Sequence, residues 1–338
     1  MKIKTKEAEA LLIKAAGKFV SPSEAKYFAR ETIAIQQKKS HQLDPLKYGV
    51  EDIASWQKNP KKKIKVLVDK QAVMLLDFAC LGSTLKLKYM HDELEKRAKK
   101  YGIASLGFKN SAVTDVISIF SDGLAKRDLV GLFAFNGGSP AGVPFGGTSP
   151  VFGTNPISYS IPTQDNPVIV DMATTELPFF KYSRALKNKQ KLPANTAVNS
   201  QGKITINPSQ VRVNDDCARL LPMGGGHKGY NILFFFEVIT GALIRCKMGD
   251  VEKSANYLPE EYGGWFMAID IAHFTDINKF KKSTSRMCDS IRSQKPAPGV
   301  KQVLVPGDAS YRRAKSIIKT GYLTVEKETY TKLKQLAE

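Results

Sequence analysis

The sequence predicts a mixed α/β fold of the α+β type, in which helical segments at both ends of the chain bracket a strand-rich centre. The strand-like segments do not alternate strictly with helices, so a doubly wound parallel sheet is not expected. Hydrophobic residues make up 42% and charged residues 25% of the 338 residues. This composition is ordinary for a globular protein and excludes a wholly disordered chain, and the length allows two domains.

Three helices are predicted before residue 60. Apolar residues recur with helical spacing over 5–18. The segment Ser21-Pro22-Ser23-Glu24 then carries a helix start signal: its first serine can cap, its proline suits the first helical position, and its glutamate can close a capping box. The second helix runs to about Lys38, and a third covers 46–56, which leaves His41 in the loop between them.

The centre of the chain mixes strands, helices and a Gly/Pro-rich loop region at 136–156. The most apolar stretch, 231–244, contains Glu237 and is too short to span a bilayer, so we expect a buried helix there. Alternation and apolar runs predict strands at 64–68, 104–108, 130–135, 157–161, 168–171 and 265–271, and a hairpin at 197–206. Helical spacing predicts helices at 84–100, 113–125, from Glu176, at 230–244, and near 276–292 and 309–319.

The net charge of +19 raises the question of nucleic-acid binding. The densest basic run, Lys61-Lys62-Lys63, is short, and the other lysines are scattered along amphipathic segments. No stretch interleaves arginine with aromatic residues, so a lysine-rich surface that attracts anionic ligands is the favoured interpretation. We therefore expect attraction of anionic ligands, including a dinucleotide, and no specific nucleic-acid binding.

The cysteines stand far apart and form no CxxC pair, which is typical of reduced thiols rather than of a disulfide framework or a zinc site. The first residues are charged and lack the apolar core of a signal peptide. We accordingly expect a cytoplasmic protein without a metal centre or a membrane segment. The four cysteines are Cys80, Cys217, Cys246 and Cys288.

Two glycine-rich segments expose backbone groups. Gly224-Gly225-Gly226-His227-Lys228-Gly229 has the GxGxxG spacing, but the Pro-containing segment before it is no first Rossmann strand. Its glycines, lysine and following helix start offer N–H groups and positive charge to a phosphate, and a plain glycine turn is an equally good interpretation. The second segment, Gly146 to Pro156, lacks a P-loop ending and is interpreted as a tight loop between strands.

His41 is the histidine with the richest polar surroundings. Ser40, Asp44, Lys47 and Tyr48 are its sequence neighbours, and a loop histidine can donate or accept a proton near neutral pH. An ordinary surface histidine is the alternative. No GxSxG elbow is present, and potential metal ligands do not cluster, which argues against hydrolase and metalloenzyme functions.

Taken together, these motifs resemble the malate/L-lactate dehydrogenase-like oxidoreductases, a family that includes ureidoglycolate and sulfolactate dehydrogenases, diketogulonate reductase and the cyclic-imine (piperideine/pyrroline-2-carboxylate) reductases. The matching segments occur in family order over nearly the whole chain. They are Ser40-His41 with Tyr48, Asn110-Ser111, Val143 to Gly147, Phe152 to Pro156, Val170 to Thr175, Leu221 to Tyr230, and Pro306-Gly307.

The resemblance implies a non-Rossmann fold with a largely antiparallel central sheet flanked by helices, a helical part built from both chain ends, and a homodimer. The expected division is 1–60 with 300–338 as a helical substrate and dimer part, and 61–299 as a cofactor-binding sheet domain. The implied cofactor is NAD or NADP, with NAD slightly favoured. The implied cofactor contacts are Asp171, Met172, Ala173, Thr174, Thr175, Glu176, Leu177, His227, Lys228, Gly307, Asp308 and Ala309.

The resemblance also implies hydride transfer between NAD(P)H and a small 2-oxo acid, its 2-hydroxy acid, or a cyclic 2-imino acid. His41 would then supply or remove the proton, with Tyr48 orienting it or the substrate. The family's substrate-binding arginine falls at Asp44, so Lys47 is the expected carboxylate partner. The family's second histidine falls at Val113, so the alternative is a catalytically impaired member that binds dinucleotide or a protein partner.

Overall fold

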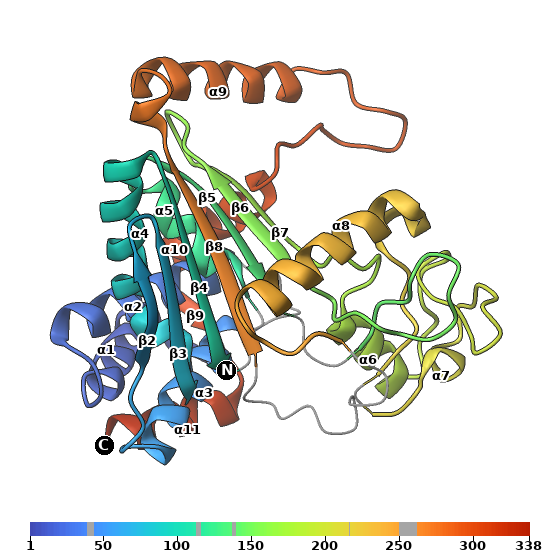
Figure 1. The fold of residues 1–338 in the computed structure, drawn as a ribbon, viewed down its shortest axis with the longest axis horizontal. Coiled ribbons are helices and arrows are strands. Elements are labelled where there is room, and N and C mark those ends of the chain that lie inside the picture. The colour runs from blue at the N-terminus through green and yellow to red at the C-terminus, as the bar shows by residue number, and fades with distance from the viewer. Residues whose placement is uncertain (39–43, 113–115, 137–139, 216, 250–261) are drawn as a thin grey trace.

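A computed structural model describes residues 1–38, 44–112, 116–136, 140–215, 217–249 and 262–338. A central sheet runs through the molecule in the strand order β2-β3-β4-β8-β5-β6-β7 (Figure 1). Only β3 and β4 pair in parallel, and every other neighbouring pair is antiparallel. The strands are β2 (Lys65–Lys70), β3 (Val73–Leu81), β4 (Ile103–Ser111), β5 (Leu129–Phe135), β6 (Ile157–Ile161), β7 (Val168–Met172) and β8 (Tyr262–Asp270). The predicted non-Rossmann, largely antiparallel sheet is therefore confirmed.

Helices cover both faces of this sheet. On one face α4 (Leu87–Tyr101) and α5 (Ser118–Ala125) pack against an aromatic core, in which the Phe120 and Phe133 rings stack 4.3 Å apart. On the other face α8 (His227–Val238) contributes Phe236 to a smaller cluster with Ala134 and Ile157 (Figure 1).

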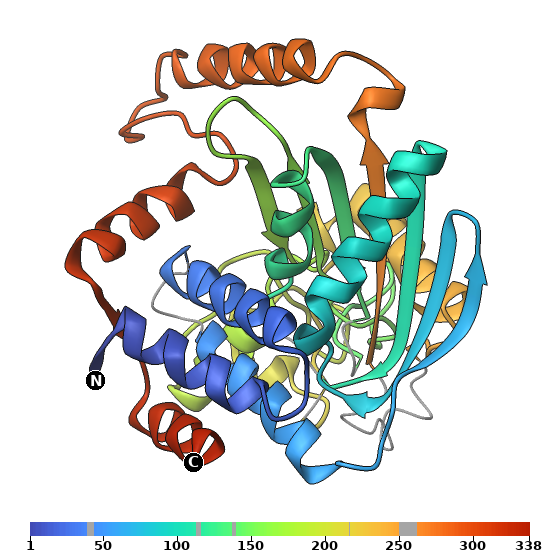
Figure 2. The same cartoon turned by 90° about the vertical axis from the view of Figure 1, so that its left-hand side faces the viewer.

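The two chain ends form one helical part. A short ladder pairs β1 (Lys2–Lys4) with β9 (Tyr322–Thr324), and a second core joins residues of both ends. Figure 2 shows the N-terminal helices in front of the sheet, with the C-terminal helices beside them. This arrangement confirms the predicted helical part. Its helices are α1 (Thr5–Ala16), α2 (Pro22–Lys38), α3 (Pro45–Lys58), α10 (Asp308–Thr320) and α11 (Lys327–Ala337).

The start of α2 confirms the predicted capping box. The Glu24 carboxylate accepts a hydrogen bond from the Ser21 amide at 3.0 Å, and the Glu24 amide donates to the Ser21 hydroxyl at 3.4 Å. These two bonds satisfy donors that a helix start would otherwise leave unpaired.

Several local predictions need correction. The helix expected from Glu176 is α6, which begins at Phe179 (Phe179–Lys187) because 173–177 is extended and bonded to 221–224. The hairpin expected at 197–206 contains only an isolated bridge between Val198 and Ile204. Strand β3 and helix α11 were not predicted. The remaining helices are α7 (Pro208–Val211) and α9 (Ile277–Arg292).

The apolar stretch 231–244 is not a buried helix, as had been expected. It forms α8 and a following π-helical turn, Ile239–Leu243, and Phe234 and Phe235 are 52% and 53% exposed. Helix α8 packs on the sheet through Phe236, whereas Phe235 and Phe234, which contacts Phe152, remain about half exposed. No helix in the described part of the chain has the length and apolar character needed to cross a membrane.

Candidate active site

The candidate proton donor His41 lies outside the described residues, as do Val113 and Asp115. The described chain stops at Lys38, the last residue of α2, and resumes at Asp44, which precedes α3.

The end of α2 is attached to two other helices. The Lys38 ammonium donates to Asp122 Oδ2 of α5 at 2.7 Å and lies 4.7 Å from the centre of the Tyr311 ring of α10. The Lys38 carbonyl accepts from Arg313 Nε at 3.0 Å, also from α10. The C-terminal end of α2 is thus bonded to both α5 and α10.

Buried charges surround this attachment. Burial lowers the pKa of Lys38. Burial alone would raise the pKa of Asp122, but the ammonium groups of Lys126 and Lys38 outweigh it and lower that pKa. Lys126 also bonds Glu31 of α2 at 2.7 Å. Because each buried charge has an opposite partner, the cluster ties α2 to α5 without leaving an isolated ion in the interior.

The other expected catalytic residues lie at the start of α3. Lys47, in its first turn, is exposed, and Tyr48 is half-buried beside it. Asp44 stands at the N-cap position, its carboxylate oxygens are buried, and this burial raises its pKa. A cation in the first turn of a helix is suited to binding a carboxylate.

Strand β7 carries the first expected cofactor segment and forms an edge of the sheet. Asp171 Oδ2 accepts from the Ser118 amide at the start of α5, at 3.0 Å. Beyond the strand, the Thr174 hydroxyl donates to the carbonyls of Thr154 and Asn155, at 3.1 and 3.0 Å. The segment is therefore fixed at both ends, by α5 and by the loop that contains Phe152 to Pro156.

The same loop also anchors α8. Asn155 Nδ2 donates to Glu237 Oε2 at 2.5 Å, and the Gly249 amide donates to Glu237 Oε1 at 2.5 Å. Burial raises the pKa of Glu237. The loop that contains Asn155 therefore contacts both the segment that follows β7 and helix α8.

The glycine-rich turn lies directly against the first cofactor segment. The Met223 amide donates to the Thr174 carbonyl at 2.9 Å, and the Gly224 amide donates to Glu176 Oε2 at 2.5 Å. Helix α8 then begins at His227, with Lys228 exposed. Gly229 is required here, because an added Cβ would lie 1.8 Å from the Met223 carbonyl oxygen.

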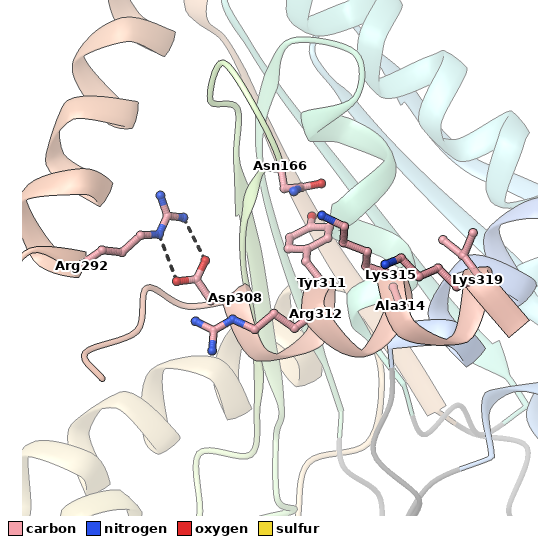
Figure 3. Close-up of a pocket in the computed structure, with 9 residues that line it drawn as sticks. Asn166, Arg292, Asp308, Tyr311, Arg312, Ala314, Lys315 and Lys319 are labelled. Atoms are coloured by element: carbon pink, nitrogen blue, oxygen red, sulfur yellow. Dashed lines mark hydrogen bonds and ion pairs between the residues drawn. The ribbon is translucent and has the colours of Figure 1, made fainter. Parts of the chain in front are cut away.

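The third expected segment, Gly307-Asp308-Ala309, lies against the other end of β7. The Ile169 amide donates to the Pro306 carbonyl at 3.4 Å. Gly307 has a φ of 101°, and an added Cβ would lie 3.3 Å from the Ile169 amide nitrogen. Asp308 is bound by Arg292, whose Nη2 and Nε donate at 2.8 and 3.1 Å (Figure 3).

All three segments expected to contact the cofactor therefore follow the line of β7. At about 3.3 Å per residue, Ile169 and Met172 of β7 lie about 10 Å apart. The Gly307 turn lies at the Ile169 end of this strand, and the glycine turn before α8 lies past its Met172 end. The α carbons of Gly224 and Gly225 face open space, next to the N-terminal amides of α8 and the exposed Lys228. These features fit an extended ligand with anionic groups, such as a dinucleotide.

Comparison with known proteins identifies the family. The family model for malate/L-lactate dehydrogenase matches residues 3–334. The chain belongs to this family. The malate/(S)-sulfolactate dehydrogenase of Methanothermus fervidus is 33% identical over 261 residues, which are 76% of this chain and 73% of the relative. The malate dehydrogenase of Pyrococcus abyssi is 28% identical over 88% of this chain and 83% of the relative.

A solved structure agrees with this assignment. Sulfolactate dehydrogenase from Methanocaldococcus jannaschii superimposes with a TM-score of 0.81 at 26% identity, covering 99% of this chain and 96% of that one. This member of the malate/L-lactate dehydrogenase family is thus an oxidoreductase with the family's non-Rossmann fold. A dehydrogenase of this kind requires a nicotinamide cofactor.

Sequence reasoning missed several residues around the site. It identified neither the Lys38–Asp122 ion pair nor the attachment of Arg313 to the end of α2, since these contacts join distant segments that share no motif. Two further histidines have partners that no local sequence pattern reveals. His91 is fully buried, with Tyr27 Oη and the Phe120 carbonyl oxygen each at 2.7 Å, and His273 Nδ1 lies 2.6 Å from Asp270 Oδ2.

Proposed function

We propose that the chain transfers a hydride between NAD(P)H and a small 2-oxo acid, its 2-hydroxy acid, or a cyclic 2-imino acid. The observation that carries this proposal is the alignment of the Asp171–Leu177, His227-Lys228 and Gly307–Ala309 segments along β7. The relatives named malate and sulfolactate dehydrogenases support a substrate with a carboxylate beside the reacting carbon.

The cofactor would lie along the outer edge of β7. The N-terminal amides of α8 and the Lys228 ammonium would bind its phosphates, because a helix start and an adjacent cation attract anions. Residues 171–177 would contact its central part, and the Gly307 turn one of its ends. Bound there, the nicotinamide supplies the hydride chemistry.

His41 would act as the acid or base of the reaction. It protonates the substrate oxygen or imine nitrogen in the reductive direction and removes that proton in the oxidative one. Tyr48 would orient His41 or the substrate, and Lys47 at the start of α3 would pair with the substrate carboxylate in place of an arginine. Lys38, the last described residue before His41, is itself attached to α5 and α10.

We further propose a homodimer located in the cytoplasm. The exposed Phe234 and Phe235 of α8 form an apolar surface that a second copy could cover. The free cysteines are compatible with a reducing compartment. The division into 1–60 with 300–338 and 61–299 remains part of this proposal.

The runner-up is an impaired family member that binds dinucleotide or a protein partner without turnover, and the sequence difference at Val113 favours it. The hydride-transfer proposal and the dinucleotide-binding form of the runner-up both require cofactor binding, which thermal unfolding detects. Millimolar NADH or NADPH should raise the unfolding midpoint, because a ligand bound only to the native state stabilises it. Adenosine alone serves as the control. An unchanged midpoint with both dinucleotides would refute the hydride-transfer proposal and leave only a protein-binding family member.

A further inference from the structure

A hollow of about 530 Å³ lies beside α10, next to the Gly307 turn (Figure 3). It is bordered by the last turn of α9, by the chain just before β7 and by one face of α10. Its lining contains four cations and one carboxylate. The charged residues are Arg292, Arg312, Lys315, Lys319 and Asp308.

The cations on α10 are arranged as one row. Asp308, Arg312, Lys315 and Lys319 follow the spacing i, i+4, i+7 and i+11, which places them on the same face of a helix. Within the described ranges, no carboxylate forms a salt bridge with Arg312, Lys315 or Lys319. By contrast, the cations of a second hollow, Lys126 and Arg127, are each paired with carboxylates. The row on α10 therefore has positive charge available for an anionic ligand.

Asp308 offsets only part of the positive charge of this row: it interacts electrostatically with Arg312, but its hydrogen bonds go to Arg292 and to the Val305 amide. Arg292 donates to both of its oxygens, and the Val305 amide donates to Oδ2 at 3.1 Å. In Rossmann-fold dehydrogenases a carboxylate commonly accepts the ribose 2′-hydroxyl of NAD, whereas a nearby arginine accommodates the 2′-phosphate of NADP. The same charge complementarity applies in any fold, because it depends only on the groups that meet. Because the Asp308 carboxylate is bonded to Arg292, it is poorly placed to accept the ribose 2′-hydroxyl of NAD. The cations of α10 are then available to bind a 2′-phosphate.

One hydrogen-bond donor at the hollow is also unused. The Tyr311 hydroxyl is buried and has no partner among the described residues, and Figure 3 shows it beside Lys315 and Asn166. Buried hydroxyl groups are normally hydrogen-bonded, so an orphaned donor at the edge of a cationic hollow points to an acceptor that arrives with a ligand.

We infer that this hollow binds the adenosine 2′-phosphate of NADPH, with Arg312 and Lys315 as its main partners. The consequence is a preference for NADPH, contrary to the slight preference for NAD expected from the sequence. The inference rests on the proposed function, since it places the adenosine end of the cofactor at the Gly307 turn.

The test is a binding titration that isolates the 2′-phosphate. Dissociation constants for NADPH and NADH are measured by fluorescence with the full-length protein, and 2′,5′-ADP and 5′-AMP are compared as competitors. The same titrations are repeated on Arg312→Ala and Lys315→Ala. Lys282→Ala serves as the matched control, because it removes one exposed cation from α9 that does not line the hollow.

The parent should bind NADPH at least about tenfold more tightly than NADH, and 2′,5′-ADP more tightly than 5′-AMP. Each α10 variant should weaken NADPH binding about 10–100-fold, as for the loss of a charged hydrogen bond, and leave NADH binding unchanged. Lys282→Ala should change neither. Equal affinity of the parent for the two dinucleotides, or equal losses for both in the α10 variants, would overturn the inference while leaving the proposed function intact. If the parent binds neither dinucleotide, the proposed function fails as well.

Discussion

His91 illustrates how burial changes a single residue. His91 lies on the buried face of α4, where its ring nitrogens contact Tyr27 Oη and the Phe120 carbonyl oxygen. Burial lowers its pKa from 6.5 to about 4. The imidazole therefore stays neutral in the folded protein at pH values where the unfolded chain protonates it. Its role is structural, and the hydrogen bonds of both ring nitrogens explain why a histidine is tolerated there.

This shift predicts a dependence of stability on pH. Between pH 6.5 and about 4 the unfolded chain binds a proton at His91 that the folded protein does not, so the free energy of unfolding falls as the pH decreases through this window. The contribution is of the order of 3 kcal/mol, at about 1.36 kcal/mol per pKa unit. Urea denaturation of the parent and of His91→Gln at several pH values measures it.

The parent and His91→Gln share all other titrating groups. The contributions of those groups therefore cancel when the two free energies of unfolding are subtracted. The stability of the parent relative to His91→Gln should therefore decline as the pH falls from 6.5 to 4. A difference that does not vary with pH would show that His91 titrates normally.

At the level of single residues, sequence reasoning succeeded where a local rule applied. The capping box at Ser21 and Glu24 depends only on spacing, and the structure has it. The Lys38–Asp122 pair and the Arg292–Asp308 pair depend on how distant segments pack, and no local pattern contains that information.

At the level of elements, α8 shows what periodicity can and cannot predict. Its apolar composition correctly indicated a helix, but the same composition suggested burial on all sides. The structure packs one face on the sheet and leaves Phe234 and Phe235 exposed. A helix that is apolar all round can be covered by its own chain or by a partner, and the sequence alone does not distinguish these cases.

The N-terminus of α8 yields a second prediction. Lys228→Ala should weaken binding of NADH and NADPH alike, by about 1–3 kcal/mol, because it removes a charged contact to phosphates that both dinucleotides share. Unchanged far-UV circular dichroism would show that the helix persists, and Lys282→Ala again provides the control. Undiminished affinity for both dinucleotides in Lys228→Ala would remove Lys228 from the cofactor site.

For the whole molecule, the sequence predicted the fold class and the segments that meet along β7, but not every element. Strand β3 is an almost unbroken apolar run with no period of two, and it pairs in parallel with β4, its neighbour beyond α4. Helix α11 is mostly polar and buries few apolar side chains, among them Leu333 and Leu336, so its periodic signal is weak. The formation of β3 and α11 therefore depends on strand pairing and packing between distant parts of the chain.

The most direct test of the central claim is turnover. The parent is assayed with NADPH and NADH against a panel of 2-oxo acids and cyclic imines, by following the loss of the reduced cofactor, and His41→Ala is assayed in parallel. We expect turnover with at least one member of the panel. Because general acid catalysis contributes about 10²–10⁴-fold, His41→Ala should lose activity by that factor at nearly unchanged cofactor affinity. Dinucleotide binding without turnover on any member of the panel would contradict the account and establish the impaired family member instead.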